Sequence, residues 1–137
     1  MVANHMDAIV QMYPELPFHK VLGFEILKTV PDMARVHLPF KSDLVSSGNA
    51  YHGGVIASLM DLTGALAAWS GHDPQKGTRA ATVSFTVQYL AAARGEDIIA
   101  EARATGRAKE LIFCDVSVRT KETDRLIAIG NLVYRTG

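Results

Sequence analysis

Hydrophobic and polar residues alternate with a period of two over several short stretches, which is the pattern of half-buried β-strands. The first two stretches cover residues 24–30 and 34–40, and Pro31-Asp32 separates them as a turn. Further stretches of this kind cover residues 79–90, 97–106, 110–120 and 125–135. Because short turns separate neighbouring stretches, the pattern predicts an antiparallel sheet of about six strands.

Residues 52–69 carry apolar side chains on nearly every side of the helix that they predict. A helix with this distribution is buried all round, so the sheet has to wrap it. One long helix segregated to one face of a curled antiparallel sheet places the chain in the α+β class. Ahead of the sheet, prolines and Gly23 end a short helical leader. We therefore expect a leader over residues 1–22 and a single domain over residues 23–137.

The composition limits the classes of partner. The chain has 137 residues, 48% of them hydrophobic, which suits one domain with a substantial core. Fourteen basic residues balance fourteen acidic ones, which argues against a nucleic acid or an anionic membrane as partner. The start of the chain lacks the pattern of a signal peptide, so we expect a cytoplasmic protein. The single cysteine, Cys114, excludes an internal disulfide and cannot alone form a structural zinc site, and the five scattered histidines suggest no metal site.

Asp61 is the only acidic or basic side chain between His52 and His72. Burying an ionised carboxylate without a partner is expensive. Asp61 must therefore be paired, be neutral, or line a cavity, and only the last of these is a catalytic interpretation. A structural aspartate bonded to backbone or to an arginine is an equally good account on physical grounds alone.

His52-Gly53-Gly54 lies where the loop becomes the helix. The first turn of a helix leaves backbone N–H groups unsatisfied at the positive end of its dipole. The amide of Gly53 or Gly54 could stabilise the oxyanion that forms when a carbonyl is attacked. The alternative is that the glycines only allow tight packing at the start of the helix.

Gly53 and Asp61 are too far apart on one helix to touch the same carbonyl group, because the helix rises about 12 Å between them. If both serve one reaction, Asp61 of one subunit must face the Gly53 amide of another. That arrangement requires two such helices packed antiparallel about a two-fold axis. A catalytic interpretation therefore predicts a homodimer.

The segment from Tyr51 to Asp61, followed by residues 82–89 and by Gly106-Arg107 ahead of residues 115–118, resembles the phenylacetate-pathway (PaaI-like) branch of hotdog-fold acyl-CoA thioesterases. The resemblance implies a hotdog fold in a homodimer or homotetramer. It also implies hydrolysis of an acyl-CoA thioester without metal or cofactor. In this family pattern Asp61 acts as general base or nucleophile, Gly53 or Gly54 polarises the thioester carbonyl, and His52 shapes the helix entrance.

Two positions match the family pattern less closely. Relatives place an asparagine about six residues before the histidine, where this chain has Ser46, while Asn49 lies only three residues before it. Asn49 could reach the substrate from a shorter loop, or Asn49 or Ser47 could cap the helix. Thr82 matches a serine or threonine near the acid in relatives, but simple alternation places it with Ser84, on the face opposite the apolar residues.

The phosphates of coenzyme A call for basic side chains near strand ends, and each candidate could also be a solvated surface charge. The candidates are Arg79, Arg94, Arg107 and Lys109, with the pair around the Gly106 turn preferred. A protein that binds acyl groups or acyl-CoA without turning them over is the alternative function, which the displaced Asn49 favours. A hydratase or dehydratase would use a histidine in the helix as its acid or base. The lone Asp61 in that helix argues against this alternative.

Overall fold

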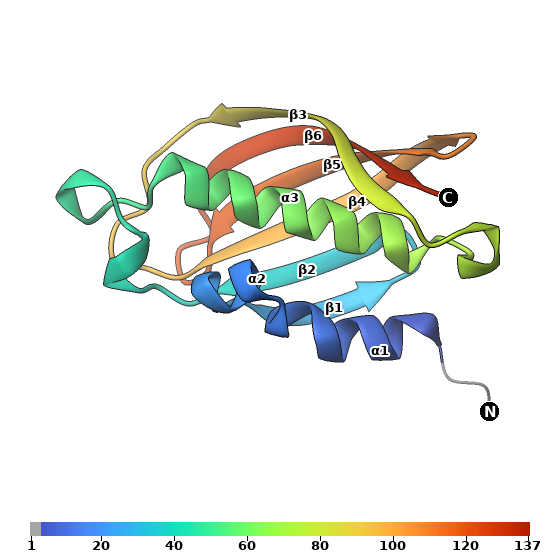
Figure 1. The fold of residues 1–137 in the computed structure, drawn as a ribbon. Coiled ribbons are helices and arrows are strands. Elements are labelled where there is room, and N and C mark those ends of the chain that lie inside the picture. The colour runs from blue at the N-terminus through green and yellow to red at the C-terminus, as the bar shows by residue number, and fades with distance from the viewer. Residues whose placement is uncertain (1–3) are drawn as a thin grey trace.

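The computed structural model describes residues 4–137, and in it one long helix lies across the face of a curved six-stranded sheet (Figure 1). The strands are all antiparallel, in the order β1-β2-β4-β5-β6-β3. The helices and strands are α1 (His5–Met12), α2 (Pro17–Leu22), β1 (Glu25–Val30), β2 (Met33–Leu38), α3 (Gly53–Ser70), β3 (Ala80–Tyr89), β4 (Ile98–Ala108), β5 (Leu111–Thr120) and β6 (Leu126–Thr136). The expected α+β hotdog fold, with a long helix wrapped by a curled sheet, is confirmed.

Helix α3 is buried on most sides, as its apolar residues predict. Leu59, Met60 and Leu66 are wholly inaccessible to solvent. Complete burial of each of these side chains contributes about 1.5–3 kcal/mol relative to exposure. Gly64 lets the helix approach β6 closely, because a Cβ at that position would overlap the side chain of Leu132. None of the helices within residues 4–137 is long and apolar enough to cross a membrane.

Strand β3 lies at one edge of the sheet and contains a β-bulge. Thr82 pairs with Tyr134 and Ser84 pairs with Val133, so Val83 is an extra residue without a partner. Directly paired residues project to the same face of a sheet. Tyr134 is buried on the side of α3, where its hydroxyl accepts a hydrogen bond from Trp69 Nε1. Thr82 therefore projects toward α3, and its expected grouping with Ser84 on the opposite face is wrong.

The segment ahead of the sheet is held to α3 by two hydrogen bonds. The Tyr13 hydroxyl donates to the carbonyl oxygen of Leu62 over 2.9 Å. His5 Nε2 lies 2.8 Å from the carbonyl oxygen of Trp69, seven residues further along the helix. Tyr13 also contacts the rings of His19 and Phe24 edge-on. Helix α1 and the turn that follows it are thus tied to the half of α3 after Asp61, and α1 lies along this half in Figure 1.

A buried histidine joins three strands at the start of β4. His37 lies between two carboxylates, with Nδ1 3.1 Å from Glu25 Oε2 and Nε2 2.8 Å from Asp97 Oδ2. The other carboxylate oxygen of Asp97 accepts the backbone N–H of Phe40 over 2.8 Å. The Phe40 amide chiefly, and the bond to His37 in addition, hold the pKa of Asp97 below its ordinary value against the effect of partial burial.

We expect Asp97→Asn to lower the free energy of unfolding by about 1 kcal/mol at neutral pH, because the charge-assisted bonds to Asp97 are lost. A carboxyl whose pKa is lowered by folding stabilises the protein above its unfolded pKa, and that stability is lost as the pH falls through the folded value. The difference between wild type and variant should therefore close in acid. Urea unfolding of both proteins, from neutral pH down to about pH 2, measures it. A difference that stays constant over this range would contradict the assignment.

Candidate active site

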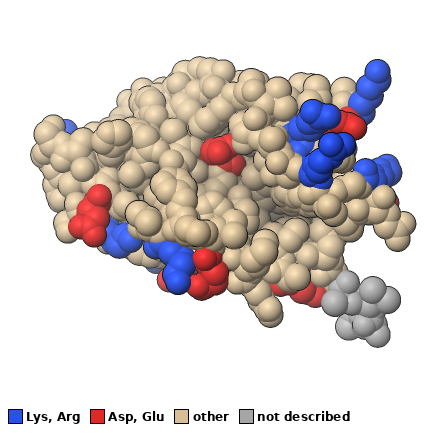
Figure 2. Space-filling view, in the orientation of Figure 1, with Lys and Arg blue, Asp and Glu red and all other residues tan. Residues whose placement is uncertain are grey.

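Asp61 lies in the middle of α3 and is half-buried. Its Oδ1 accepts a hydrogen bond from Thr82 Oγ1 over 2.7 Å, which the bulge in β3 makes possible. Within residues 4–137, no arginine and no backbone amide bonds to this carboxylate, contrary to the structural alternative considered from the sequence. The face over α3 in Figure 2 is nearly free of charged side chains apart from one small acidic area. Asp61 therefore keeps one oxygen available to a ligand.

The two candidate amides at the start of α3 differ in their hydrogen bonding. His52 is the N-cap, and its Nδ1 accepts the backbone N–H of Gly54 over 2.8 Å. The amide of Gly54 is thereby occupied, while the amide of Gly53 has no acceptor among the described residues. Of the two glycines, Gly53 is the one able to donate to an oxyanion. The alternative that Asn49 or Ser47 caps the helix is wrong, because His52 does so.

A hollow of about 370 Å³ lies beside this free amide. Gly53 forms part of its wall with Ile56 and the short side chains of residues 91–93. Tyr89 also lines it, and its hydroxyl donates to the carbonyl oxygen of Gly53 over 2.7 Å. Sequence reasoning missed Tyr89, although its place on the same face of β3 as Phe85 and Val87 is a signal that could have found it.

Asn49 lies apart from the free amide. It is exposed, adopts a positive φ of 63°, and its carbonyl oxygen accepts the backbone N–H of Gly95 over 3.3 Å. Its side chain also lies against Gly95, where an added Cβ would come within 2.8 Å of Asn49 Nδ2. The loop ahead of α3 thus directs Asn49 toward the turn before β4.

The four basic candidates fall into two groups. Arg107 pairs with Asp32 beside Gly71, at the C-terminal end of α3. Lys109 forms the turn between β4 and β5, with a φ of 57°, and Arg79 bonds to the carbonyl oxygen of Gly137. Basic side chains gather at this end of the molecule in Figure 2. Arg94 lies by the loop ahead of α3 instead, where it donates to the carbonyl oxygen of Gly48 over 2.6 Å.

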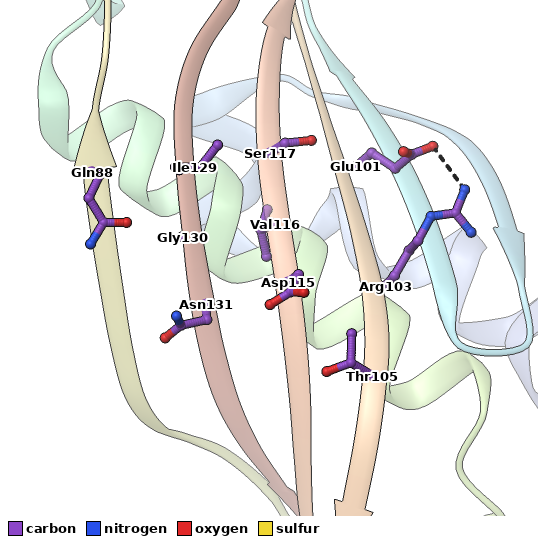
Figure 3. A pocket seen from close by; sticks show the side chains of 10 residues that line it. All are labelled: Gln88, Glu101, Arg103, Thr105, Asp115, Val116, Ser117, Ile129, Gly130 and Asn131. Carbon is purple, nitrogen blue, oxygen red and sulfur yellow. Dashed lines mark ion pairs between the residues drawn. The ribbon is translucent and has the colours of Figure 1, made fainter.

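A polar hollow lies on the other face of the sheet, away from α3 (Figure 3). It measures about 410 Å³, and Gln88, Arg103, Asp115 and Asn131 project into it from four strands. An ion pair of 3.8 Å joins Arg103 to Glu101 at its rim. None of the residues that the sequence predicts for the site lines this hollow, so the candidate site remains on the helix side of the sheet.

The chain matches known protein families and relatives over most of its length. Residues 48–127 match the family model described as the thioesterase superfamily. A relative from Archaeoglobus fulgidus named "Putative esterase" is 30% identical, and the match covers 90% of this chain and 78% of the relative. The medium/long-chain acyl-CoA thioesterase YigI of Escherichia coli is 27% identical over 89% of this chain and 86% of its own length.

Solved structures share the fold over nearly the whole chain. Zebrafish thioesterase superfamily member 2 superposes with a TM-score of 0.85 at 25% identity, covering 98% of this chain and all of its own. The PaaI protein of the E. coli phenylacetic acid degradation operon superposes with a TM-score of 0.84 at 20% identity, covering 96% and 92%. The chain therefore belongs to the thioesterase superfamily and is a thioester hydrolase with the hotdog fold.

Proposed function

We propose that this enzyme hydrolyses acyl-CoA thioesters to a free acid and coenzyme A, with Asp61 of one subunit and the Gly53 amide of a second subunit in each site. The observation that carries the proposal is the carboxylate of Asp61, which is half-buried, held by Thr82, and free of any cationic partner within residues 4–137. Two relatives support the substrate class. One is the acyl-CoA thioesterase YigI, and the other is the Streptococcus mutans protein smu.793, solved bound to acetyl CoA.

The free edge of β3 supports the shared site. This ten-residue strand pairs only with β6, and its other edge has no partner among the described residues. It exposes 55% of Val83 and 52% of Tyr89. Long, exposed, apolar strand edges are usually covered in native proteins. Antiparallel pairing of two β3 edges about a two-fold axis would cover them and bring two α3 helices together in opposite directions.

In this arrangement the N–H of Gly53 from the partner subunit holds the thioester oxygen. As general base, Asp61 takes a proton from water while the water oxygen bonds to the carbonyl carbon, and the C=O electron pair moves onto that oxygen. The C=O bond then re-forms, the C–S bond breaks, and the coenzyme A thiolate receives the proton from Asp61. As nucleophile, Asp61 bonds to the carbon, the thiolate leaves, and water hydrolyses the resulting anhydride.

The basic end of the molecule supports a site for the nucleotide. Opposed helices place the C-terminal end of one α3, with Arg107 and Lys109 close to it, beside the N-terminal end of the other. The phosphates of coenzyme A would then meet these side chains while the thioester lies at Gly53 of the partner subunit. Arg79 belongs to the same end, whereas Arg94 contributes from the opposite end of its own chain.

A protein that binds acyl-CoA without hydrolysing it is the second candidate. The position of Asn49 favours it, because this side chain lies at Gly95 and makes no hydrogen bond to the start of α3 within residues 4–137. Release of thiol from a panel of aryl-CoA and fatty-acyl-CoA thioesters separates the two candidates. An enzyme turns over at least one of them. A binding protein gives saturable binding without thiol release from any.

Mixing two inactive variants tests whether the site is shared. A chain with Asp61→Asn still supplies Gly53, and a chain with Gly53→Pro still supplies Asp61. After random reassortment of equal amounts, about half of the dimers contain one chain of each kind. Each mixed dimer has one intact site and one doubly altered site, so we expect about a quarter of wild-type activity to return. The measurement is thiol release after the two variants are unfolded together and refolded. Two variants refolded separately and then assayed together are the control, and no recovery after joint refolding would contradict a shared site.

A further inference from the structure

Tyr134 is buried beside the Asp61–Thr82 pair, and its role is not evident from the sequence. It is the direct cross-strand partner of Thr82, so its side chain stands next to that of Thr82 on the face toward α3. Only 8% of Tyr134 is exposed. Thr82 bonds to Asp61 from β3, and the side chain of Tyr134 lies beside Thr82 on the neighbouring strand β6.

The hydrogen of the Tyr134 hydroxyl is available to a ligand. The oxygen accepts the Nε1–H of Trp69 over 3.1 Å, which fixes the phenol in place. The O–H itself has no acceptor among residues 4–137. A phenol can donate one hydrogen bond, and a buried donor left without an acceptor is costly. The fold thus holds a buried phenol with an unused hydrogen beside Thr82, the residue that bonds to Asp61.

Charge effects agree with this placement. Burial first, and the negative charge of Asp61 after it, raise the pKa of Tyr134 above its ordinary value, against the opposing effect of the Trp69 bond. The pKa of Tyr13 is raised too, chiefly by burial, then by Tyr134 and then by Asp61. Tyr134 therefore stays protonated in neutral solution and can act as a donor.

We propose that Tyr134 orients the attacking water, whose oxygen accepts the phenol hydrogen while one of its own hydrogens points to the free oxygen of Asp61. Thr82 holds the other carboxylate oxygen of Asp61. The Thr82 hydroxyl thus fixes the base, and the Tyr134 hydroxyl fixes the water that gives up the proton. No direct hydrogen bond joins Tyr134 to Asp61 within the described residues, and an ordered water molecule can bridge two polar groups of this kind. With its second lone pair the water faces the thioester carbon. The role rests on the proposed hydrolytic function of Asp61.

Two Tyr→Phe variants form a matched pair for the test. Tyr134→Phe removes the proposed donor to water and the acceptor of Trp69. Tyr13→Phe removes a hydroxyl from the same region, but its hydrogen is already bound by the carbonyl oxygen of Leu62. Each variant loses one hydrogen bond, so both should lower Tm by a similar amount, about 3–6 °C.

Steady-state hydrolysis separates them. We expect Tyr134→Phe to lower kcat about 10-fold with KM unchanged, and Tyr13→Phe to keep the wild-type kcat. A Tyr134→Phe enzyme with wild-type kcat would overturn the role of Tyr134 and leave the thioesterase function intact, and so would an equal fall of kcat in both variants. A wild-type protein that releases no thiol would overturn the function and this role together.

Discussion

Asp61→Asn is expected to lower kcat by about 100-fold or more while the protein stays folded and assembled. Asparagine keeps the size and the bond from Thr82, but its amide can neither take a proton from water nor attack a carbonyl carbon. Because Asp61 has no cationic partner within residues 4–137, the substitution leaves no other charge uncompensated. Any loss of rate can then be assigned to the chemistry itself.

Thiol release under steady-state conditions measures this effect, on the substrate that wild type prefers. Asp115→Asn is the matched control, because it makes the same chemical change on the outer face of the sheet, where Asp115 lines the hollow of Figure 3. Tm and elution volume of all three proteins show whether the fold and assembly persist. If Asp61→Asn hydrolyses thioesters as fast as wild type, the proposed mechanism is wrong.

Gly53→Pro is expected to lower kcat by about 100- to 1000-fold, as the loss of one oxyanion donor does in other enzymes. Proline has no N–H, so the substitution removes the proposed donor atom itself. The first position of a helix tolerates proline, and the residue before it must be extended. His52 already is, with φ of −60° and ψ of 135°. The helix should therefore form in the variant.

Gly53→Ala is the control for added bulk at this position. A Cβ there would lie 3.4 Å from the ring of Tyr89, which is an ordinary contact, and the N–H is kept. We expect the alanine enzyme to retain activity within about 5-fold of wild type. The measurement compares kcat of the two variants on one substrate. Equal losses in both would mean that the side chain, and not the amide, is responsible.

The elements of the fold are predictable because each follows from a local periodicity. The all-round apolar pattern of residues 52–69 requires a wrapped helix, and α3 spans Gly53–Ser70. The two-residue alternation identifies the strands, and Ala34, Val36 and Leu38 are buried as the alternation of the second stretch predicts. Asp61 is also visible from sequence, since a charge in an apolar helix is costly without a purpose.

The details of the site are less predictable because they depend on pairing between distant segments. The contact of Thr82 with Asp61 requires a bulge, which no local pattern reveals. Tyr134 lies beside Thr82 because of the register of β3 against β6. These two residues are fifty-two positions apart along the chain. The choice of Gly53 over Gly54 depends on the rotamer of His52, which takes up the second amide.

The unpaired Val83 has a consequence for aligning this chain with its relatives. A homologue that lacks the extra residue needs a one-residue gap at Val83. Without that gap, every position on one side of it is matched to a residue of the opposite face. The hydroxyl residue that contacts the acid would then be sought among the outward side chains, and a true counterpart of Thr82 could be recorded as missing.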